Sequence, residues 1–250
     1  MIPPWTDYTP EEAIALQREL AARVKLHPLP ERFDVLGCAD ISYITDTNES
    51  VAMILTFEWP GLKLLETVHA VEPTRFPYIS GLLSFREIPP LLTAYEKLAR
   101  KPDVFLCDGQ GIAHPRRIGL ASHMGLVLGI PSVGCAKTRL AGKHDAFELK
   151  RGNYTPLLLR GDVVGCVYCT RDNVKPVYIS PGHLADLESS RRLVERCLGR
   201  YRAPEPLRFA HNYATRLRVE LAATRAENQP PPGGPSEAPA AQPRKRRVHR

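Results

Sequence analysis

The sequence predicts an α/β protein in which a mixed sheet is flanked by helices. Three strand-like segments, at residues 34–44, 51–59 and 63–71, are joined only by short turns, so the sheet should begin as an antiparallel meander. Later strand-like segments alternate with helical ones, which is typical of parallel strands covered by helices on both faces. The 250 residues are enough for one such domain with an extension.

The first helix is predicted from its capping signals. Thr9 can cap it, Pro10 suits the first helical position, and Glu12 completes a capping box. Apolar periodicity and turn residues then predict the remaining elements. These are helices at 84–98, around 116–129, near Ala185 and near Pro206, and strands at 102–109, 131–137, 163–170 and 175–180.

The chain divides into a predicted catalytic domain, residues 1–225, and a tail, residues 226–250. The tail holds six prolines and few large apolar residues, so it cannot bury enough surface to offset the entropy of ordering. We therefore expect it to be disordered. Its basic end, RKRRVHR, is either a solubilising terminus or an additional contact to a phosphate backbone.

Charge and cysteine usage limit the classes of function. The net charge of +7 permits nucleic-acid binding but does not establish it. The N-terminus has no basic and apolar leader pattern, and no apolar run is long enough to cross a bilayer, so we expect a cytoplasmic protein that does not engage membranes. The six cysteines lie in apolar runs, as buried free thiols do in a reducing compartment. Cys166 and Cys169 form a CxxC without a second pair at zinc spacing, which disfavours zinc.

Three acidic residues are candidates for a metal site. Asp40 lies inside the first strand, Asp108 follows a buried strand at a glycine-rich turn, and Glu87 lies near the start of a helix. A buried carboxylate needs a partner or a metal, and clustered carboxylates suit Mg²⁺ or Mn²⁺ in phosphodiester hydrolysis. The alternative is three unrelated structural acids, namely a turn cap, a helix-dipole partner and a paired strand residue.

Four basic residues likewise have both a functional and a structural interpretation. His114 and Arg116 come directly after the Asp108 turn, where they could contact phosphate or simply be solvated. Lys137 ends a strand and is either a second phosphate contact or an ordinary surface lysine. His211, on a late helix, is either a structural histidine or a proton donor.

Several of these motifs, in order, resemble those of the endonuclease V family. The similarity spans about residues 10–220 and is carried by GCADISY, PYISGLLSFREIPPLL, CDGQGIAHPRRIGLASHMGLVLGIPSVGCAKTRL, YISPGH and YRAPEPLRFAHN. The resemblance implies a ribonuclease H-like fold and a Mg²⁺-dependent enzyme that nicks single- or double-stranded DNA at the second phosphodiester bond 3′ to deoxyinosine. The products would carry 3′-hydroxyl and 5′-phosphate ends. Mn²⁺ should substitute for Mg²⁺, and we expect a monomer.

The resemblance also implies a role for each matching residue. Asp40 and Asp108 would bind the metal with Glu87, while Lys137 and His211 would assist catalysis. A wedge at the lesion would consist of Pro77, Tyr78, Ile79 and Ser80. A pocket for the flipped hypoxanthine base would consist of Gly81, Leu83, Gly109, Gly111 and Leu120.

Ser80 departs from the family, because the wedge of this family usually ends in proline. Serine would loosen the tip, since it lacks the fixed φ of proline. Three other functions stay open at this point. They are an inosine-specific ribonuclease of the same family, a non-catalytic inosine-binding protein, and a ribonuclease H-like transposase or resolvase, which would lack the Tyr78 wedge and the pocket glycines.

Overall fold

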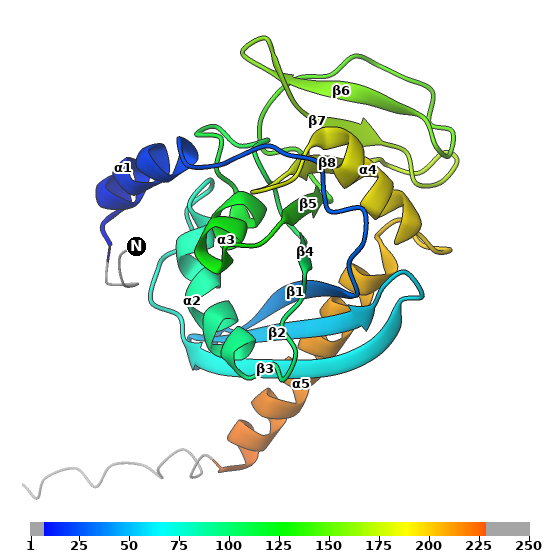
Figure 1. The fold of residues 1–250 in the computed structure, drawn as a ribbon. Helices are drawn as coiled ribbons and strands as arrows, with labels where there is room; N and C mark the ends of the chain where they lie inside the picture. Colours follow the sequence, from blue (N-terminus) through cyan, green and yellow to red (C-terminus); the bar gives the residue numbers. More distant parts are fainter. Residues whose placement is uncertain (1–7, 229–250) are drawn as a thin grey trace, which may run out of the picture.

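The computed structural model describes residues 8–228, which form one eight-stranded sheet covered by helices on both faces (Figure 1). The strand order is β3-β2-β1-β4-β5-β8-β7-β6. The strands are β1 Val35–Ile44, β2 Glu49–Glu58, β3 Lys63–Pro73, β4 Val104–Cys107, β5 Ser132–Ala136, β6 Tyr154–Leu159, β7 Asp162–Tyr168 and β8 Val177–Pro181. The helices are α1 Pro10–Ala21, α2 Leu83–Glu96, α3 Leu120–Leu128, α4 Leu187–Arg196 and α5 Glu205–Asn228.

The pairing confirms the predicted mixed sheet and its opening meander. Strands β1, β2 and β3 pair antiparallel, and β4 and β5 then add in parallel to β1. The far side of the sheet differs from the prediction, because β8, β7 and β6 pair antiparallel. Strand β6 was not predicted at all. It is an exposed edge strand with Pro156 in it and only Leu157 fully buried, so it lacks a clear two-residue pattern.

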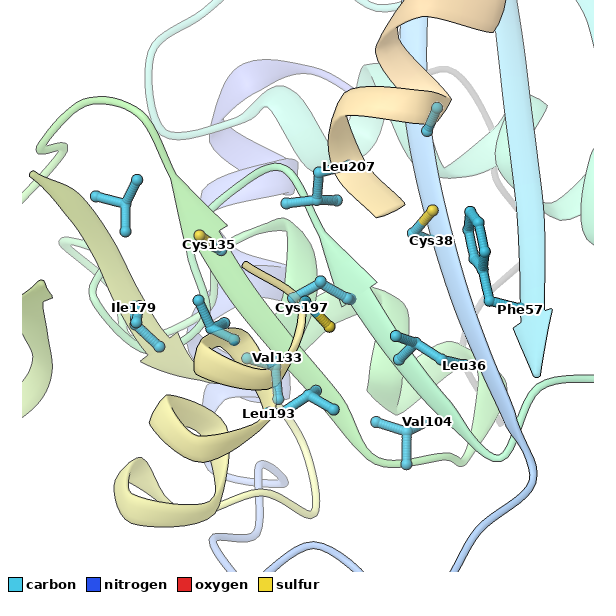
Figure 2. Close-up of a cluster of buried hydrophobic side chains, with 14 of the residues drawn as sticks. Leu36, Cys38, Phe57, Val104, Val133, Cys135, Ile179, Leu193, Cys197 and Leu207 are labelled. Atoms are coloured by element: carbon cyan, nitrogen blue, oxygen red, sulfur yellow. The ribbon is translucent and has the colours of Figure 1, made fainter. Parts of the chain in front are cut away.

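Two apolar layers fix the helices on the sheet. On one face, α4 and α5 cover side chains of the central strands, as Figure 2 shows for Leu36, Val133, Leu193 and Leu207. On the other face, α2 and α3 cover Phe105 and its neighbours. The central strands are therefore buried on both faces, as their continuous apolar sequences require.

The capping box predicted for α1 is present. The Thr9 hydroxyl accepts a hydrogen bond from the Glu12 backbone, and the Glu12 carboxylate accepts one from the Thr9 backbone. Helix α2 begins at Leu83, so Glu87 lies in its second turn rather than at its start. Helix α3 begins at Leu120, and Arg116 therefore lies in the preceding loop rather than on the helix.

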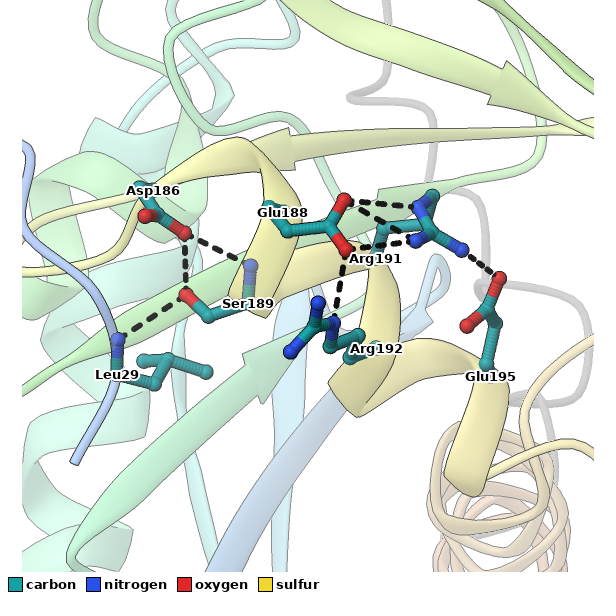
Figure 3. Close-up of polar contacts among 7 residues, drawn as sticks. All are labelled: Leu29, Asp186, Glu188, Ser189, Arg191, Arg192 and Glu195. Atoms are coloured by element: carbon teal, nitrogen blue, oxygen red, sulfur yellow. Dashed lines mark hydrogen bonds and ion pairs between the residues drawn. The ribbon is translucent and has the colours of Figure 1, made fainter. Parts of the chain in front are cut away.

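A polar network at α4 holds the segment between α1 and β1 (Figure 3). Asp186 caps α4 by accepting a hydrogen bond from the Ser189 backbone at 2.7 Å, and it also accepts one from the Ser189 hydroxyl. That hydroxyl in turn accepts one from the Leu29 backbone at 3.0 Å. Further along the helix, Arg191 pairs with Glu188 and with Glu195.

Helix α5 changes the predicted boundary of the tail. The helix continues to Asn228, three residues beyond the boundary expected at residue 225. The rest of the predicted tail, residues 229–250, lies outside the described residues. In the described part of the chain, none of the helices combines the length and apolarity that crossing a membrane would require.

Candidate active site

The parallel register between β1 and β4 brings two aspartates together. Ala39 pairs with Cys107, so the next residue on each strand, Asp40 and Asp108, lies at adjacent positions where β4 ends. Neighbouring strands lie about 4.8 Å apart, which places the two carboxylates side by side. This edge is the carboxyl end of the parallel strands, where α/β sheets bind ligands.

Glu87 reaches the two aspartates from α2. It lines a small cavity of about 50 Å³ together with Asp40 and Asp108. The hydroxyl of Tyr43 donates a hydrogen bond of 3.4 Å to Glu87, and the guanidinium of Arg86 stacks on the Tyr43 ring at 4.2 Å. Arg86 also donates to the Phe76 carbonyl at 3.0 Å, so the Arg86–Glu87 pair connects the acidic cluster to the loop before α2.

Burial and repulsion between carboxylates raise the pKa values of Glu87 and Asp40. Burial, followed by the charges of Asp40 and Asp108, raises the pKa of Glu87 to about 8. Burial and the charge of Asp108 raise the pKa of Asp40, although His211 and Lys137 act in the opposite direction. A cation placed among the three would relieve this cost.

Two basic side chains lie on the aspartates. Lys137, from the end of β5, is 2.5 Å from the Asp108 carboxylate. His211, from α5, has its Nδ1 atom 3.0 Å from the Asp40 carboxylate. The structure therefore brings all five predicted catalytic residues to one edge of the sheet, from β1, α2, the β4 end, the β5 end and α5.

The donor set fits a hard divalent cation. Asp40, Glu87 and Asp108 offer only carboxylate oxygens, which Mg²⁺ and Mn²⁺ prefer. Among residues 8–228, no three His, Cys, Asp or Glu side chains are arranged as a preassembled metal centre. Instead, Asp108 is paired with Lys137 and Asp40 with His211.

A second, larger cavity of about 570 Å³ adjoins the acidic cluster. Glu87, Asp108 and Leu120 line both cavities. The larger one is of the size of a small-molecule site. Of the residues predicted for the wedge and the pocket, it is lined by Tyr78, Ser80, Gly81, Leu83, Gly109 and Leu120.

Two of the four wedge residues, Tyr78 and Ser80, line this cavity. Tyr78 has 73% of its surface accessible, although it is aromatic. Pro77 and Ser80 are also exposed, whereas Ile79 is partly buried against the cluster around α1. An exposed tyrosine beside a cavity can stack on a base.

Gly111 does not line the cavity, in contrast to the prediction. A Cβ atom on it would lie 1.9 Å from the Pro181 carbonyl, so this glycine permits close packing of the loop on β8. The Gly111 backbone donates to the Ser180 hydroxyl at 2.7 Å. In the structure, Gly111 therefore serves the packing of its loop on β8 and is not among the residues that line the cavity.

His114 and Arg116, predicted to contact phosphate, are bonded to protein groups. The His114 ring is buried and lies 2.9 Å from the Gly81 carbonyl. The Arg116 guanidinium donates to the same carbonyl at 2.7 Å. Both side chains are therefore directed to the turn at the cavity mouth.

Two glutamines that line the cavity were assigned no role from the sequence. Gln17 lies on the buried face of α1 with only 1% of its surface exposed, and its signal is a polar residue between Leu16 and Leu20 in an apolar stripe. Gln110 lies between two glycines of the motif that follows Asp108. Its amide donates to the Thr138 carbonyl at 2.9 Å.

The fold and the acidic edge define the class of protein, a nuclease of ribonuclease H-like architecture. Comparison with known proteins identifies the family. The family model for endonuclease V matches residues 18–212, which is most of the chain. The chain belongs to the endonuclease V family.

Individual relatives agree with this assignment. Endonuclease V of Trichormus variabilis is 45% identical over 213 residues, covering 85% of this chain and 96% of the relative. The crystal structure of endonuclease V from Streptomyces avermitilis has a TM-score of 0.82 at 38% identity, covering 88% of this chain and 97% of its own. A Ciona intestinalis endonuclease V variant, in complex with a 23mer DNA containing an inosine followed by a ribo-adenosine, has a TM-score of 0.75 at 25% identity and covers 86% of this chain and all of its own.

Proposed function

We propose that this protein is a Mg²⁺-dependent endonuclease that recognises deoxyinosine in DNA and hydrolyses the second phosphodiester bond on its 3′ side. The products carry 3′-hydroxyl and 5′-phosphate ends. The observation that carries the proposal is that a cavity large enough for a base adjoins the carboxylate cluster, with Glu87, Asp108 and Leu120 lining both cavities. The inosine-containing DNA bound by the Ciona intestinalis relative supports the choice of lesion.

Recognition would take place at the larger cavity. Tyr78, with Pro77, Ile79 and Ser80, would enter the stack where the flipped nucleotide has left it. The base would lie against the backbone of Gly81 and Leu83 on one side and of Gly109 and Leu120 on the other. Backbone donors and acceptors suit hypoxanthine, whose O6 and protonated N1 need one donor and one acceptor.

Catalysis would take place at the acidic edge. Asp40, Glu87 and Asp108 would hold the metal, with Mn²⁺ able to replace Mg²⁺. The cation would supply Lewis-acid stabilisation of charge on the phosphodiester. Lys137 would orient the phosphate from its position beside Asp108, and His211 would donate or position a proton beside Asp40. Hydrolysis would proceed by in-line attack of water, without a covalent enzyme intermediate.

The molecule would act as a monomer in the cytoplasm on single- or double-stranded DNA. All six cysteines are free and buried, as is usual in a reducing compartment. The predicted tail, residues 226–250, with its basic end RKRRVHR, would lie outside the catalytic domain.

A gel assay with one deoxyinosine in a defined duplex tests this function. We expect one cut at the second bond 3′ to the lesion in Mg²⁺, none in EDTA, and none with Asp40→Ala or Asp108→Ala. Matched DNA and RNA oligonucleotides, run in parallel, decide between DNA and RNA as the substrate. Strong preference for inosine RNA would replace the proposal with an inosine-specific ribonuclease, and metal-independent binding without cleavage would replace it with an inosine-binding protein.

A further inference from the structure

One backbone carbonyl beside the cavity accepts three side-chain hydrogen bonds. The Gly81 oxygen is 3.0 Å from Gln17 Nε2, 2.9 Å from His114 Nε2 and 2.7 Å from an Arg116 terminal nitrogen. A carbonyl oxygen has two lone pairs, so three donors are more than an ordinary loop residue attracts. The three come from α1 and from the loop before α3.

The hydrogen bonds of His114 determine its protonation state. Its Nδ1 atom accepts from the Arg116 backbone at 3.2 Å, so the proton must reside on Nε2, which donates to Gly81. Burial lowers the pKa of His114 to about 4, which keeps the ring neutral at physiological pH. The ring is therefore a fixed donor rather than a mobile cation.

The carbonyl belongs to a tight turn, residues 79–82, here named the recognition turn. Leu82 donates to the Ile79 carbonyl at 2.9 Å, and Gly81 has a φ of 80°. Ser80 has no positive φ, so the turn is of type II, in which glycine is required at the third position. The peptide group between Gly81 and Leu82 is thus held at its oxygen by three side chains and at its nitrogen by Ile79.

Gln17 ties this arrangement to the rest of the molecule. Its Nε2 donates to Gly81, and its Oε1 accepts from Arg116 Nε at 2.5 Å. Helix α1 is itself fixed, because Leu16 and Leu20 pack with Phe76 and Phe85, the residues on either side of the recognition turn. Helix α1 therefore supports the recognition turn through this packing and through the hydrogen bond of Gln17.

We propose that Gln17 and Arg116 are positioning residues that, with His114, hold the recognition turn in the shape that admits the lesion base. This inference rests on the proposed function, since it concerns the groups that shape the cavity in which the substrate would bind. It also gives Arg116 a role other than phosphate contact. Gln17 lines the cavity, but it is uncharged and 1% exposed, and both polar atoms of its amide are bonded to Gly81 and Arg116, so we expect it to act on substrate binding through the turn.

The test compares Gln17→Met and Arg116→Ala with Arg117→Ala. Methionine keeps the volume of Gln17 but makes no hydrogen bond. Arg117 is the matched control, because it follows Arg116 in the same loop but pairs with Asp162 at 2.7 Å on the surface. Steady-state nicking of a deoxyinosine duplex should show KM raised about tenfold in the first two variants, the typical worth of a buried hydrogen bond, with kcat within about twofold of wild type.

Two further readouts separate positioning from a phosphate contact. The KM of the double variant of Gln17→Met and Arg116→Ala should be no higher than that of the more impaired single variant, since both substitutions act on one carbonyl. The salt dependence of binding should be unchanged by both single substitutions, whereas loss of a phosphate contact reduces the slope by about one. Should Gln17→Met fold poorly, as judged by its melting curve, Arg116→Lys replaces it, because a lysine cannot donate to Gln17 and Gly81 in the fork geometry of arginine.

The outcomes are distinct from those of the proposed function. If wild type does not cut at deoxyinosine, the proposed function fails irrespective of the variants. If wild type cuts and Gln17→Met matches it in KM, the inference is wrong. A reduced salt slope in Arg116→Ala, with no effect of Gln17→Met, would also overturn it and assign Arg116 to phosphate.

Discussion

Replacing Glu87 by glutamine should stabilise the metal-free protein while abolishing nicking. The carboxyl lies with Asp40 and Asp108 around one cavity, and its pKa is raised from the ordinary value of 4.5 to about 8. The folded state therefore holds a proton that the unfolded state has already released, and stability falls as the pH rises from 4.5 to 8. Glutamine has the same shape, keeps an oxygen for Tyr43 and does not titrate.

The size of the effect follows from the pKa values. A pKa raised from 4.5 to about 8 corresponds to a full cost of about 4–5 kcal/mol above pH 8. The carboxyl keeps some contact with solvent, which screens part of this cost, so we expect Glu87→Gln to gain about 2 kcal/mol at pH 8. The gain should vanish at pH 4, where both states are protonated.

Urea unfolding in EDTA at several pH values measures this gain. Glu96→Gln, on the exposed end of the same helix, is the control for losing one negative charge and should change stability by less than about 0.5 kcal/mol. Equal pH dependence of wild type and Glu87→Gln, or a less stable variant at pH 8, would refute the electrostatic reasoning. Full nicking activity in the variant would refute the place of Glu87 in the catalytic cluster.

Three further substitutions test other parts of the structure. His123 is 0% exposed, and burial lowers its pKa to about 3, so the unfolded state takes up a proton before the folded state as the pH falls. This linkage destabilises the wild-type protein by about 2 kcal/mol between pH 7 and 5. In His123→Asn, urea titrations should show a decrease in unfolding free energy over this range that is smaller by that amount. Ser80→Pro should raise stability by about 0.4–1 kcal/mol in thermal unfolding, because Ser80 occupies the second position of a type II turn, where proline is favoured; a lower melting temperature would contradict this assignment. Gly111→Ala should lower the free energy of unfolding by about 4 kcal/mol or more, because its Cβ would meet the Pro181 carbonyl. Gly109→Ala should destabilise the protein less, because its Cβ would face the flexible Leu120 side chain. Equal melting temperatures of the two variants would contradict the packing argument.

The sequence predicted the central part of the fold because the signals there are local. Continuous apolar strands, a complete capping box around Thr9 and short turns between strands 1 to 3 are each readable without tertiary information. Strand β6 could not be predicted in this way. It is held by pairing with β7 along an exposed edge, so its residues carry no burial pattern of their own.

The candidate site also contains residues that local sequence makes recognisable and residues whose importance depends on tertiary contacts. Asp40 and Asp108 are recognisable as unusual because each lies in or beside an apolar strand, and their meeting then depends on a register that the sequence does not state. Gln17 shows the reverse. Its partner, Gly81, is 64 residues away, and its importance depends entirely on a contact between distant segments. Gly111 shows that a glycine in a conspicuous motif can also serve close packing, because a Cβ atom there would meet the Pro181 carbonyl.

The electrostatics of the acidic edge bear on what kind of nucleic-acid protein this is. Burial and neighbouring carboxylates raise the pKa values of Glu87 and Asp40, which costs folding free energy, and the acidic cluster repels a phosphate. A protein that only bound inosine would be more stable, and would bind more tightly, with neutral residues at these positions. A nuclease needs them, because a divalent cation held there offsets both the mutual repulsion and the charge of the phosphodiester. Glu87→Gln therefore separates the two functions. In EDTA it should bind a deoxyinosine duplex at least as tightly as wild type, and in Mg²⁺ it should fail to cut, while weaker binding in EDTA would show that Glu87 contributes to recognition itself.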